Sequence, residues 1–301
     1  MSVVEKAIQK FREQQHSAGE AQAPAQSHLP QAPLPSEPAL PQAAAAPRLP
    51  PVILDRSALR AAGLMAPEEE TDLLTRQYRK IKHPLVAKAM GRGAPREPKG
   101  YLIMIASAMA GEGKSFTAVN LALSLALEKD VNVLLVDADV AKPQLSHVLR
   151  VANQPGLIDV LRDAERDVEA LIRTTNVPSL SFLPAGAEAA DATELLSSPR
   201  MERTAALLGQ RDSRRIVVFD SPPLLQTTES PALARVAGQI VVVVRAQSTP
   251  QPVLLDALST LQGHPSVSLV LNQSTQSSTA PYYYYGYRGE GSGPAPADVS
   301  G

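Results

Sequence analysis

The sequence predicts an α/β fold with a mostly parallel, doubly wound sheet and disordered ends. Apolar runs of strand length alternate with helical patterns along the middle of the chain, as a parallel sheet requires. Most of these runs are continuously apolar, which is expected of strands that helices cover on both faces. For 301 residues with 44% hydrophobic residues, one domain of roughly 200 residues with flexible ends is the simplest fit.

The chain begins with a predicted amphipathic helix over residues 1–16. Its apolar side chains recur at helical spacing and form one stripe among charges: Val4, Ala7, Ile8 and Phe11. Two interpretations remain open. The helix docks onto a partner, or it folds back onto the domain.

Residues 17–54 form a predicted linker, because the stretch up to residue 50 consists mainly of Ala, Pro, Gln and Ser. Such a composition cannot assemble a core and favours a mobile, partly extended chain. The folded domain is predicted over residues 55–273. Residues 274–301, rich in Ser, Gly and Pro around a group of tyrosines, form a predicted disordered tail.

A helix is predicted from Ala66 to His83, since Glu68–Glu70 place negative charge in its first turn. Pro84 is expected to end it. Three basic residues recur three apart along one face: Arg76, Arg79 and Lys82. That face is either solvated or a contact with another subunit.

A glycine-rich stretch, residues 107–115, joins the apolar run 101–106 to a helix-like segment over residues 116–128. This order is typical of a phosphate-binding P-loop, in which backbone N–H groups turn around phosphate oxygens. Lys114 would reach the β- and γ-phosphates, and the Ser115 hydroxyl would ligate Mg²⁺. Alanine stands at residue 108, where the common pattern has its first glycine. The predicted nucleotide-binding residues here are Met109, Ala110, Gly111, Glu112, Gly113, Lys114, Ser115 and Phe116.

Carboxylates follow two further apolar runs. Asp137 and Asp139 end the run that begins at Val133, and Asp220 ends the run that begins at Ile216. Because ligands of open parallel sheets bind beyond the carboxyl ends of the strands, we expect these aspartates to meet the P-loop. Further strands are predicted near 180–184, 214–220, 239–245 and 267–272, with helical patterns over residues 187–208 and 252–261.

Composition argues against several classes of protein. A formal charge of −1 does not favour a nucleic-acid surface. The chain has no cysteine, so it lacks a disulfide framework and a thiol nucleophile. No run approaches the ~18 apolar residues of a membrane span, and the charged start lacks a signal-peptide core. We therefore expect a soluble, intracellular protein.

These motifs resemble those of the bacterial tyrosine kinases, a branch of the MinD/ParA-like P-loop ATPases. The resemblance rests on Gly-Glu-Gly-Lys-Ser over 111–115, Asp-Ala-Asp followed by Lys142-Pro143, and Asp-Ser-Pro-Pro over 220–223. Five of the seven tyrosines lie within residues 282–287, like the C-terminal cluster of that family. Residues 1–8 and 78–85 are similar to one subgroup, the autokinases of exopolysaccharide loci with exosortase (PEP-CTERM) systems.

The resemblance implies a protein-tyrosine autokinase that uses ATP and Mg²⁺ and regulates exopolysaccharide synthesis or export. Lys114, Asp137 and Asp139 would be catalytic, and Ser115, Asp137 and Asp220 would hold the metal ion. Asn272 would recognise adenine, although a strand-end turn explains an asparagine there equally well. The implied acceptors, modified in trans, are Tyr282, Tyr283, Tyr284, Tyr285 and Tyr287.

The resemblance also implies partners. These are a membrane polysaccharide co-polymerase that activates the kinase, further copies in a ring-like oligomer, and a phosphotyrosine phosphatase. The protein would be cytoplasmic and recruited to the inner face of the membrane.

Two other functions compete with the kinase. A MinD/ParA-like positioning ATPase is one, but such proteins carry a signature lysine where this chain has Met109. The other is an ATP-binding regulatory subunit without kinase activity, which the intact Lys114, Asp137, Asp139 and Asp220 argue against.

Overall fold

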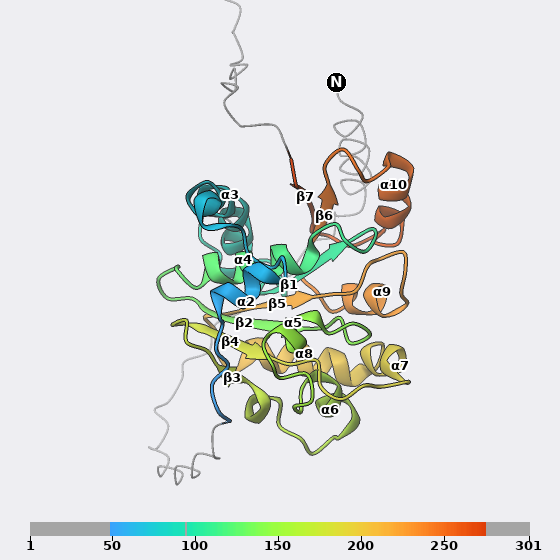
Figure 1. The fold of residues 1–301 in the computed structure, drawn as a ribbon. Coiled ribbons are helices and arrows are strands. Elements are labelled where there is room, and N and C mark those ends of the chain that lie inside the picture. The colour runs from blue at the N-terminus through green and yellow to red at the C-terminus, as the bar shows by residue number, and fades with distance from the viewer. Residues whose placement is uncertain (1–48, 94, 275–301) are drawn as a thin grey trace, which may run out of the picture. The chain divides into compact units, whose positions relative to one another are not determined.

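A seven-stranded sheet forms the centre of the computed structural model, which describes residues 49–93 and 95–274 (Figure 1). The strand order is β3-β4-β2-β5-β1-β6-β7, and every neighbouring pair is parallel except β3 with β4. The strands are β1 (Leu102–Ser107), β2 (Asn132–Asp137), β3 (Arg173–Thr174), β4 (Leu180–Leu183), β5 (Arg215–Asp220), β6 (Gln239–Arg245) and β7 (Val267–Asn272). The sequence predicts this mostly parallel α/β sheet correctly, but it does not predict the two-residue β3.

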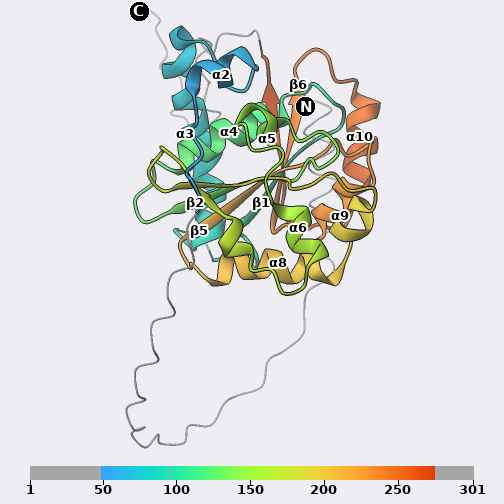
Figure 2. The same ribbon diagram turned by 60° about the horizontal axis from the view of Figure 1, so that its bottom comes forward.

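Helices cover both faces of the sheet, as the continuously apolar strands require. The elements before β2 are α2 (Arg56–Ala61), the 3₁₀ turn η1 (Glu68–Glu70), α3 (Thr71–Met90) and α4 (Lys114–Leu125). Those after β2 are α5 (Gln144–Val148), α6 (Leu157–Arg162), η2 (Val168–Leu171), α7 (Ala192–Leu196), α8 (Pro199–Gln210), α9 (Glu229–Ala234) and α10 (Gln251–Ser259). In Figure 2, α3 and α4 lie on one side of the sheet and α6 and α8 on the other.

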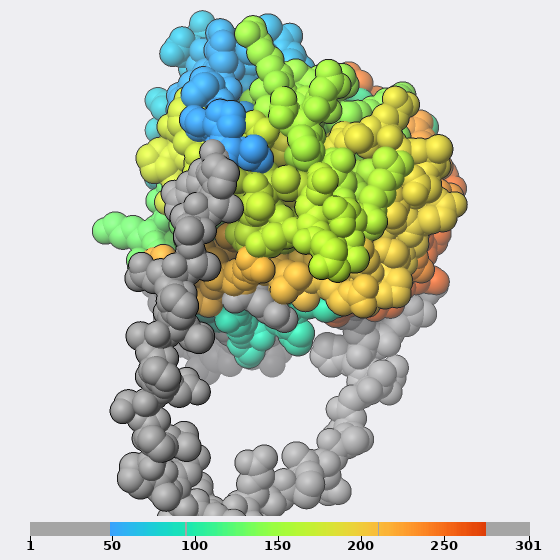
Figure 3. Space-filling view, turned by 90° about the horizontal axis from the view of Figure 1, so that it is seen from below, coloured from blue at the N-terminus to red at the C-terminus, as the bar shows by residue number. Residues whose placement is uncertain are grey.

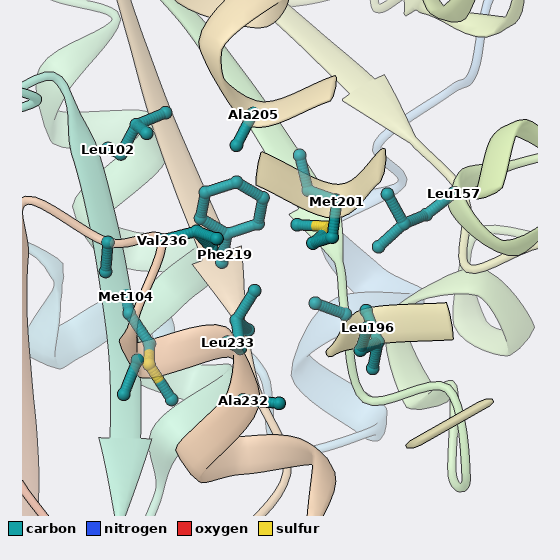
Figure 4. Close-up of a cluster of buried hydrophobic side chains, with 14 of the residues drawn as sticks. Leu102, Met104, Leu157, Leu196, Met201, Ala205, Phe219, Ala232, Leu233 and Val236 are labelled. Atoms are coloured by element: carbon teal, nitrogen blue, oxygen red, sulfur yellow. The ribbon is translucent and has the colours of Figure 1, made fainter. Parts of the chain in front are cut away.

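Alternation along the strands divides the core into two clusters. In β1, Met104 points into a cluster with Phe219 of β5 and Met201 of α8, whereas Ile103 and Ile105 face the other way. Figure 4 shows the first cluster, where Phe219 lies among Met201, Leu233 and Val236. The segments that contain α6 and α8 cover this side of the molecule (Figure 3). Two buried layers therefore hold the sheet rigid beneath the loops at its carboxyl edge.

The prediction that the helix ends at Pro84 is wrong. The helix begins at Thr71, after η1, and continues through Pro84 to Met90, where Gly91 ends it at φ 70°. Proline removes one helical hydrogen bond and its ring crowds the preceding turn. Beyond the proline, Leu85, Val86 and Ala89 are buried in the second core cluster, and this burial outweighs the local cost.

The predicted basic face of that helix is also wrong in part. Arg76 and Arg79 are exposed, but Lys82 is buried. The Lys82 ammonium donates to the Ser124 carbonyl at 2.7 Å and pairs with Glu128 at 2.7 Å. Lys82 therefore belongs to the packing of α3 on the end of α4, and it is not a free surface charge.

The helical pattern over residues 187–208 is not one helix. It contains α7 and α8, which Ser197 and Ser198 separate. Proline disfavours the helical conformation of the residue before it. Ser198, which precedes Pro199 at the start of α8, is accordingly extended (φ −77°, ψ 154°). Its side chain accepts a hydrogen bond from the Met201 amide at 3.4 Å, so the break is also an N-cap.

The predicted linker ends too late at residue 54. The Val52 amide donates to the Thr174 carbonyl at 2.9 Å, and both Val52 and Leu54 are buried in the second core cluster. The packed domain therefore includes residues before Asp55. The predicted docking helix 1–16, most of the linker and the tyrosine-bearing tail lie outside the described residues.

Across residues 49–93 and 95–274, no helix combines the length and the apolar character that crossing a membrane requires.

Candidate nucleotide and phosphoryl-transfer site

The loop from Ala108 to Gly113 connects β1 to α4, and its glycines allow the turn. Gly111 and Gly113 have φ of 83° and 97°, in the left-handed region that favours glycine. Ala108 is buried and has no positive φ, so alanine replaces the usual first glycine without backbone strain. The loop leads directly into α4 at Lys114, which places the helix N-terminus and its partial positive charge beside the turn.

Lys114 lies close to two of the predicted aspartates. Its ammonium lies 2.7 Å from an Asp139 carboxylate oxygen and 4.0 Å from Oδ1 of Asp220. Burial lowers the pKa of Lys114, but the charges of Asp220 and Asp139 outweigh it, so the net shift is upward. Lys114 therefore stays protonated and can neutralise a phosphate.

Asp137 lies at the end of β2 directly beside Asp220 at the end of β5, because these residues pair in the register of the two strands. Oδ2 of Asp137 accepts hydrogen bonds from the Ser146 amide at 2.8 Å and the Ser146 hydroxyl at 2.7 Å. Its Oδ1 is buried and has no hydrogen-bond partner. Burial, together with the neighbouring Asp220, raises the pKa of Asp137 to about 7.

Both carboxylate oxygens of Asp220 are buried without a hydrogen bond. Burial raises the pKa of Asp220 to about 6, although the charge of Lys114 acts in the opposite direction. A buried carboxylate is costly unless a cation or donors satisfy it. The unpartnered oxygens of Asp220 and Asp137, beside the helix that carries Ser115, therefore fit a divalent cation.

Magnesium suits this donor set. Protein sites for Mg²⁺ usually supply one or two carboxylates, and substrate phosphates and water complete the octahedron. Within the described part of the chain, no group of three or more His, Cys, Asp or Glu side chains is arranged to hold a metal ion. Asp137 and Asp220 match the one or two carboxylates that such a Mg²⁺ site supplies.

A cavity of about 1300 Å³ opens at this edge of the sheet. It is lined by eight of the predicted site residues: Ala110, Gly111, Gly113, Lys114, Ser115, Phe116, Asp139 and Asn272. Asp137 and Asp220 are buried and do not line the cavity, but their negative charges raise the pKa of Lys114. Met109 and Glu112 do not line the cavity.

Several lining residues escaped the sequence analysis. Gly63 and Leu64 come from the connection between α2 and α3, and His147 comes from α5. No local signal marks them, because they reach the cavity only through the packing of distant segments. Gln226 also lines it, and its side-chain oxygen accepts from the Ala110 amide at 3.1 Å. Its position shortly after Asp220-Ser221-Pro222-Pro223 was the one available hint.

Asn272 lies at the end of β7, beside the P-loop. Its amide nitrogen donates to the Glu112 carbonyl at 2.9 Å. A Cβ at residue 113 would lie 2.0 Å from that nitrogen, so another residue there would displace the Asn272 side chain, and φ of 97° favours glycine. The proposed recognition of adenine by Asn272 stays a prediction.

This chain is similar to several known proteins. A family model described as an AAA domain matches residues 100–262. The tyrosine-protein kinase YwqD of Bacillus subtilis is 31% identical over 195 residues, which cover 65% of this chain and 78% of that protein. The tyrosine-protein kinase ptk of Acinetobacter johnsonii is 32% identical over 151 residues, 50% of this chain. This chain spans only 20% of the length of the Acinetobacter protein.

A solved structure of the BceF tyrosine kinase domain superimposes with a TM-score of 0.57 at 28% identity, covering 74% of this chain and 90% of that one. The family model, which spans residues 100–262, covers β1 to β6, the P-loop and the strand ends that carry the aspartates. The chain therefore belongs to the bacterial tyrosine-kinase family of P-loop proteins with the MinD/ParA-like fold.

Proposed function

We propose that this chain is an ATP-dependent protein-tyrosine autokinase. Its acceptors are the tail tyrosines of a neighbouring copy: Tyr282, Tyr283, Tyr284, Tyr285 and Tyr287. The observation that carries the proposal is Lys114 surrounded by Asp139, Asp220 and Asp137 at the mouth of a nucleotide-sized cavity. The names of the kinase relatives support it.

Phosphoryl transfer needs charge neutralisation and alignment more than covalent chemistry. The P-loop amides and Lys114 hold the β- and γ-phosphates, and Lys114 exchanges its contact with Asp139 for one with phosphate. Ser115, Asp137 and Asp220 would hold Mg²⁺, which would supply further neutralisation of the phosphate oxygens. Phe116 and Asn272 lie at the cavity wall, where the rest of the nucleotide fits.

Asp137 and Asp139 share a second task. A tyrosine hydroxyl has an unperturbed pKa near ~10, so a carboxylate beside it promotes loss of its proton during attack on the γ-phosphorus. Asp139 faces the cavity and Asp137 lies behind it with a free Oδ1. Asp139 is therefore the carboxylate that an entering tyrosine can contact directly, and Asp137 acts from behind it.

The cellular role that we propose is regulation of exopolysaccharide synthesis or export, as in the autokinases of exosortase loci. A membrane polysaccharide co-polymerase recruits the protein to the inner face of the membrane and activates it. A ring of copies lets one tail enter the next active site, and a phosphotyrosine phosphatase reverses the reaction.

Incubation of the purified protein with Mg²⁺-ATP, followed by phosphopeptide mass spectrometry, tests the activity. We expect phosphate on the peptide that contains residues 282–287. Hydrolysis of ATP without phosphotyrosine, in the presence and absence of membranes, would favour a positioning ATPase and contradict the kinase.

A further inference from the structure

Glu112 lies inside the P-loop, yet its side chain does not face the cavity. The residue is 4% exposed. One carboxylate oxygen accepts a hydrogen bond from the Met109 amide at 2.8 Å, and the other accepts from the Thr249 hydroxyl. A buried carboxylate in a phosphate-binding loop is thus turned away from the phosphates and satisfied by two donors.

Thr249 links this loop to another part of the sheet. It lies in the connection between β6 and α10, outside the cavity lining. Its hydroxyl oxygen also accepts from the Arg245 amide at 3.1 Å. The threonine therefore joins the P-loop, through Glu112, to the backbone at the end of β6.

A second hydrogen bond connects Glu112 to the end of the neighbouring strand. The Asn272 amide donates to the Glu112 carbonyl, and Asn272 pairs with Arg245 in the register of β7 and β6. Both the carboxylate and the carbonyl of Glu112 are thus held from the ends of neighbouring strands. The glycines on either side of Glu112 have positive φ and do not restrain the turn as strongly as other residues would.

We propose that Thr249 and Glu112 are positioning residues of the nucleotide site. Their hydrogen bond keeps the carboxylate turned away and holds the loop in the shape that presents its amides to phosphate. If the bond is lost, the carboxylate can turn toward the cavity, where its charge opposes the phosphates. The inference rests on the proposed binding of ATP at this loop. It adds Thr249, which touches neither nucleotide nor acceptor.

Thr249→Val tests the proposal, since it keeps the shape of the side chain and removes the hydroxyl. We expect the affinity for a fluorescent ADP analogue to fall about tenfold, which corresponds to one hydrogen bond to a charged group. In the kinase assay the KM for ATP should rise while kcat at saturating ATP stays near that of the parent. Thr249→Ser retains the hydroxyl and should restore the affinity.

Thr175→Val is the matched control. Thr175 is also half-buried and lies at the far edge of the sheet. Its hydroxyl makes three backbone hydrogen bonds: it donates to the Val177 and Leu180 carbonyls and accepts from the Val177 amide. It should bind the nucleotide like the parent. If Thr249→Val does not fold, Thr249→Ala removes the same hydroxyl with less bulk.

A parent protein that binds the analogue, together with a folded Thr249→Val that binds equally well, would overturn this inference and leave the proposed function intact. A melting temperature that falls in Thr249→Val with no change in affinity would show a merely structural role and also overturn it. A parent that binds no nucleotide would overturn the proposed function and this inference with it.

Discussion

The Lys114 ammonium lies among three carboxylates, those of Asp137, Asp139 and Asp220. The ammonium contacts Asp139 directly and Asp220 at 4.0 Å, while Asp220 has no hydrogen bond. One cation does not neutralise three acidic groups at low dielectric. In the proposed function, a magnesium ion would add positive charge beside Asp220, and a phosphate would replace Asp139 as the partner of Lys114.

Lys114→Met should abolish tail phosphorylation without unfolding the protein. Loss of one group that stabilises developing charge typically lowers kcat by about 10²–10³. Quantitative phosphotyrosine mass spectrometry measures the loss, and circular dichroism checks the fold. Lys129→Met, at an exposed lysine, is the control and should stay active. Normal phosphorylation by a folded Lys114→Met protein would show that the site is misassigned.

Tyr78 predicts a change of stability at high pH. Burial raises the pKa of Tyr78 to about 12, above an unfolded value of ~10. The neutral phenol therefore contributes stability that is complete below pH ~10 and is lost as the pH rises towards 12. The difference between the two pKa values corresponds to about 2–3 kcal/mol in the free energy of unfolding.

Urea unfolding at pH 8 and pH 11 checks this expectation. Tyr78→Phe has no ionisable group there, so the parent should lose more stability than the variant between the two pH values. Equal losses would contradict the assignment to Tyr78, because other groups titrate alike in both proteins.

Helix α3 supports α4, the helix that begins at Lys114. α3 packs along α4, and Lys82 of α3 donates to the carbonyl of Ser124 in the last turn of α4. Carbonyls of the last turn have no helical donor, and the negative end of the helix dipole attracts a cation. This contact stabilises the helix that begins with the P-loop, so packing at one end of α4 supports the site at the other.

Lys82→Met should lower the free energy of unfolding by about 1–3 kcal/mol, because it leaves the buried Ser124 carbonyl without its donor. Glu128 keeps only its pairing with Arg92 at 3.7 Å. Arg79→Met, three residues earlier on the exposed surface, should change it by less than about 0.5 kcal/mol. Denaturant titration of both variants gives the comparison. A Lys82→Met protein as stable as Arg79→Met would mean that the ion pair contributes nothing.

The predicted helix over residues 1–16 supports a prediction of its own. Its apolar stripe on a proline-rich linker suits docking onto a membrane-embedded co-polymerase, and charges on the stripe would oppose that burial. Ile8→Asp with Phe11→Asp should therefore release the protein from membranes of cells that contain the partner, without altering ATP affinity. Co-sedimentation with membranes at the level of the parent would contradict the docking role.

At the scale of the whole molecule, the site lies at one edge of the sheet and the predicted acceptors lie beyond residue 274, after β7. Transfer between copies would couple catalysis to assembly. Each phosphotyrosine adds roughly −1.5 to −2 charges at pH 7, and Asp137, Asp139 and Asp220 already make the site acidic. In the proposed function, the site would therefore repel a tail that it had phosphorylated.

Mixing experiments test transfer in trans. Lys114→Met protein cannot phosphorylate itself, so phosphate on its tail, after addition of a variant with the five tail tyrosines changed to Phe, must come from the other chain. We expect that phosphate, and we expect light scattering to show a loss of mass as parent assemblies become phosphorylated. An unmodified Lys114→Met tail would refute transfer in trans, and unchanged mass after full phosphorylation would refute disassembly.

The sequence by itself determined the sheet, the P-loop and the strand-end aspartates. These features depend on local signals: continuous apolar runs, a glycine turn before a helix, and carboxylates at strand ends. Parallel pairing then forces the ends of β1, β2 and β5 to one edge, so Lys114, Asp137 and Asp220 had to meet there once the fold was known.

Tertiary structure decided the features that depend on contacts between segments far apart in the chain. α3 continues past Pro84 because the next turn is buried, and Lys82 leaves the surface because the end of α4 needs a cation. Gly63 and His147 join the cavity, and Glu112 turns away from it towards Thr249, 137 residues later. Local periodicity carries no information on such contacts, since burial and hydrogen bonding across the sheet set them.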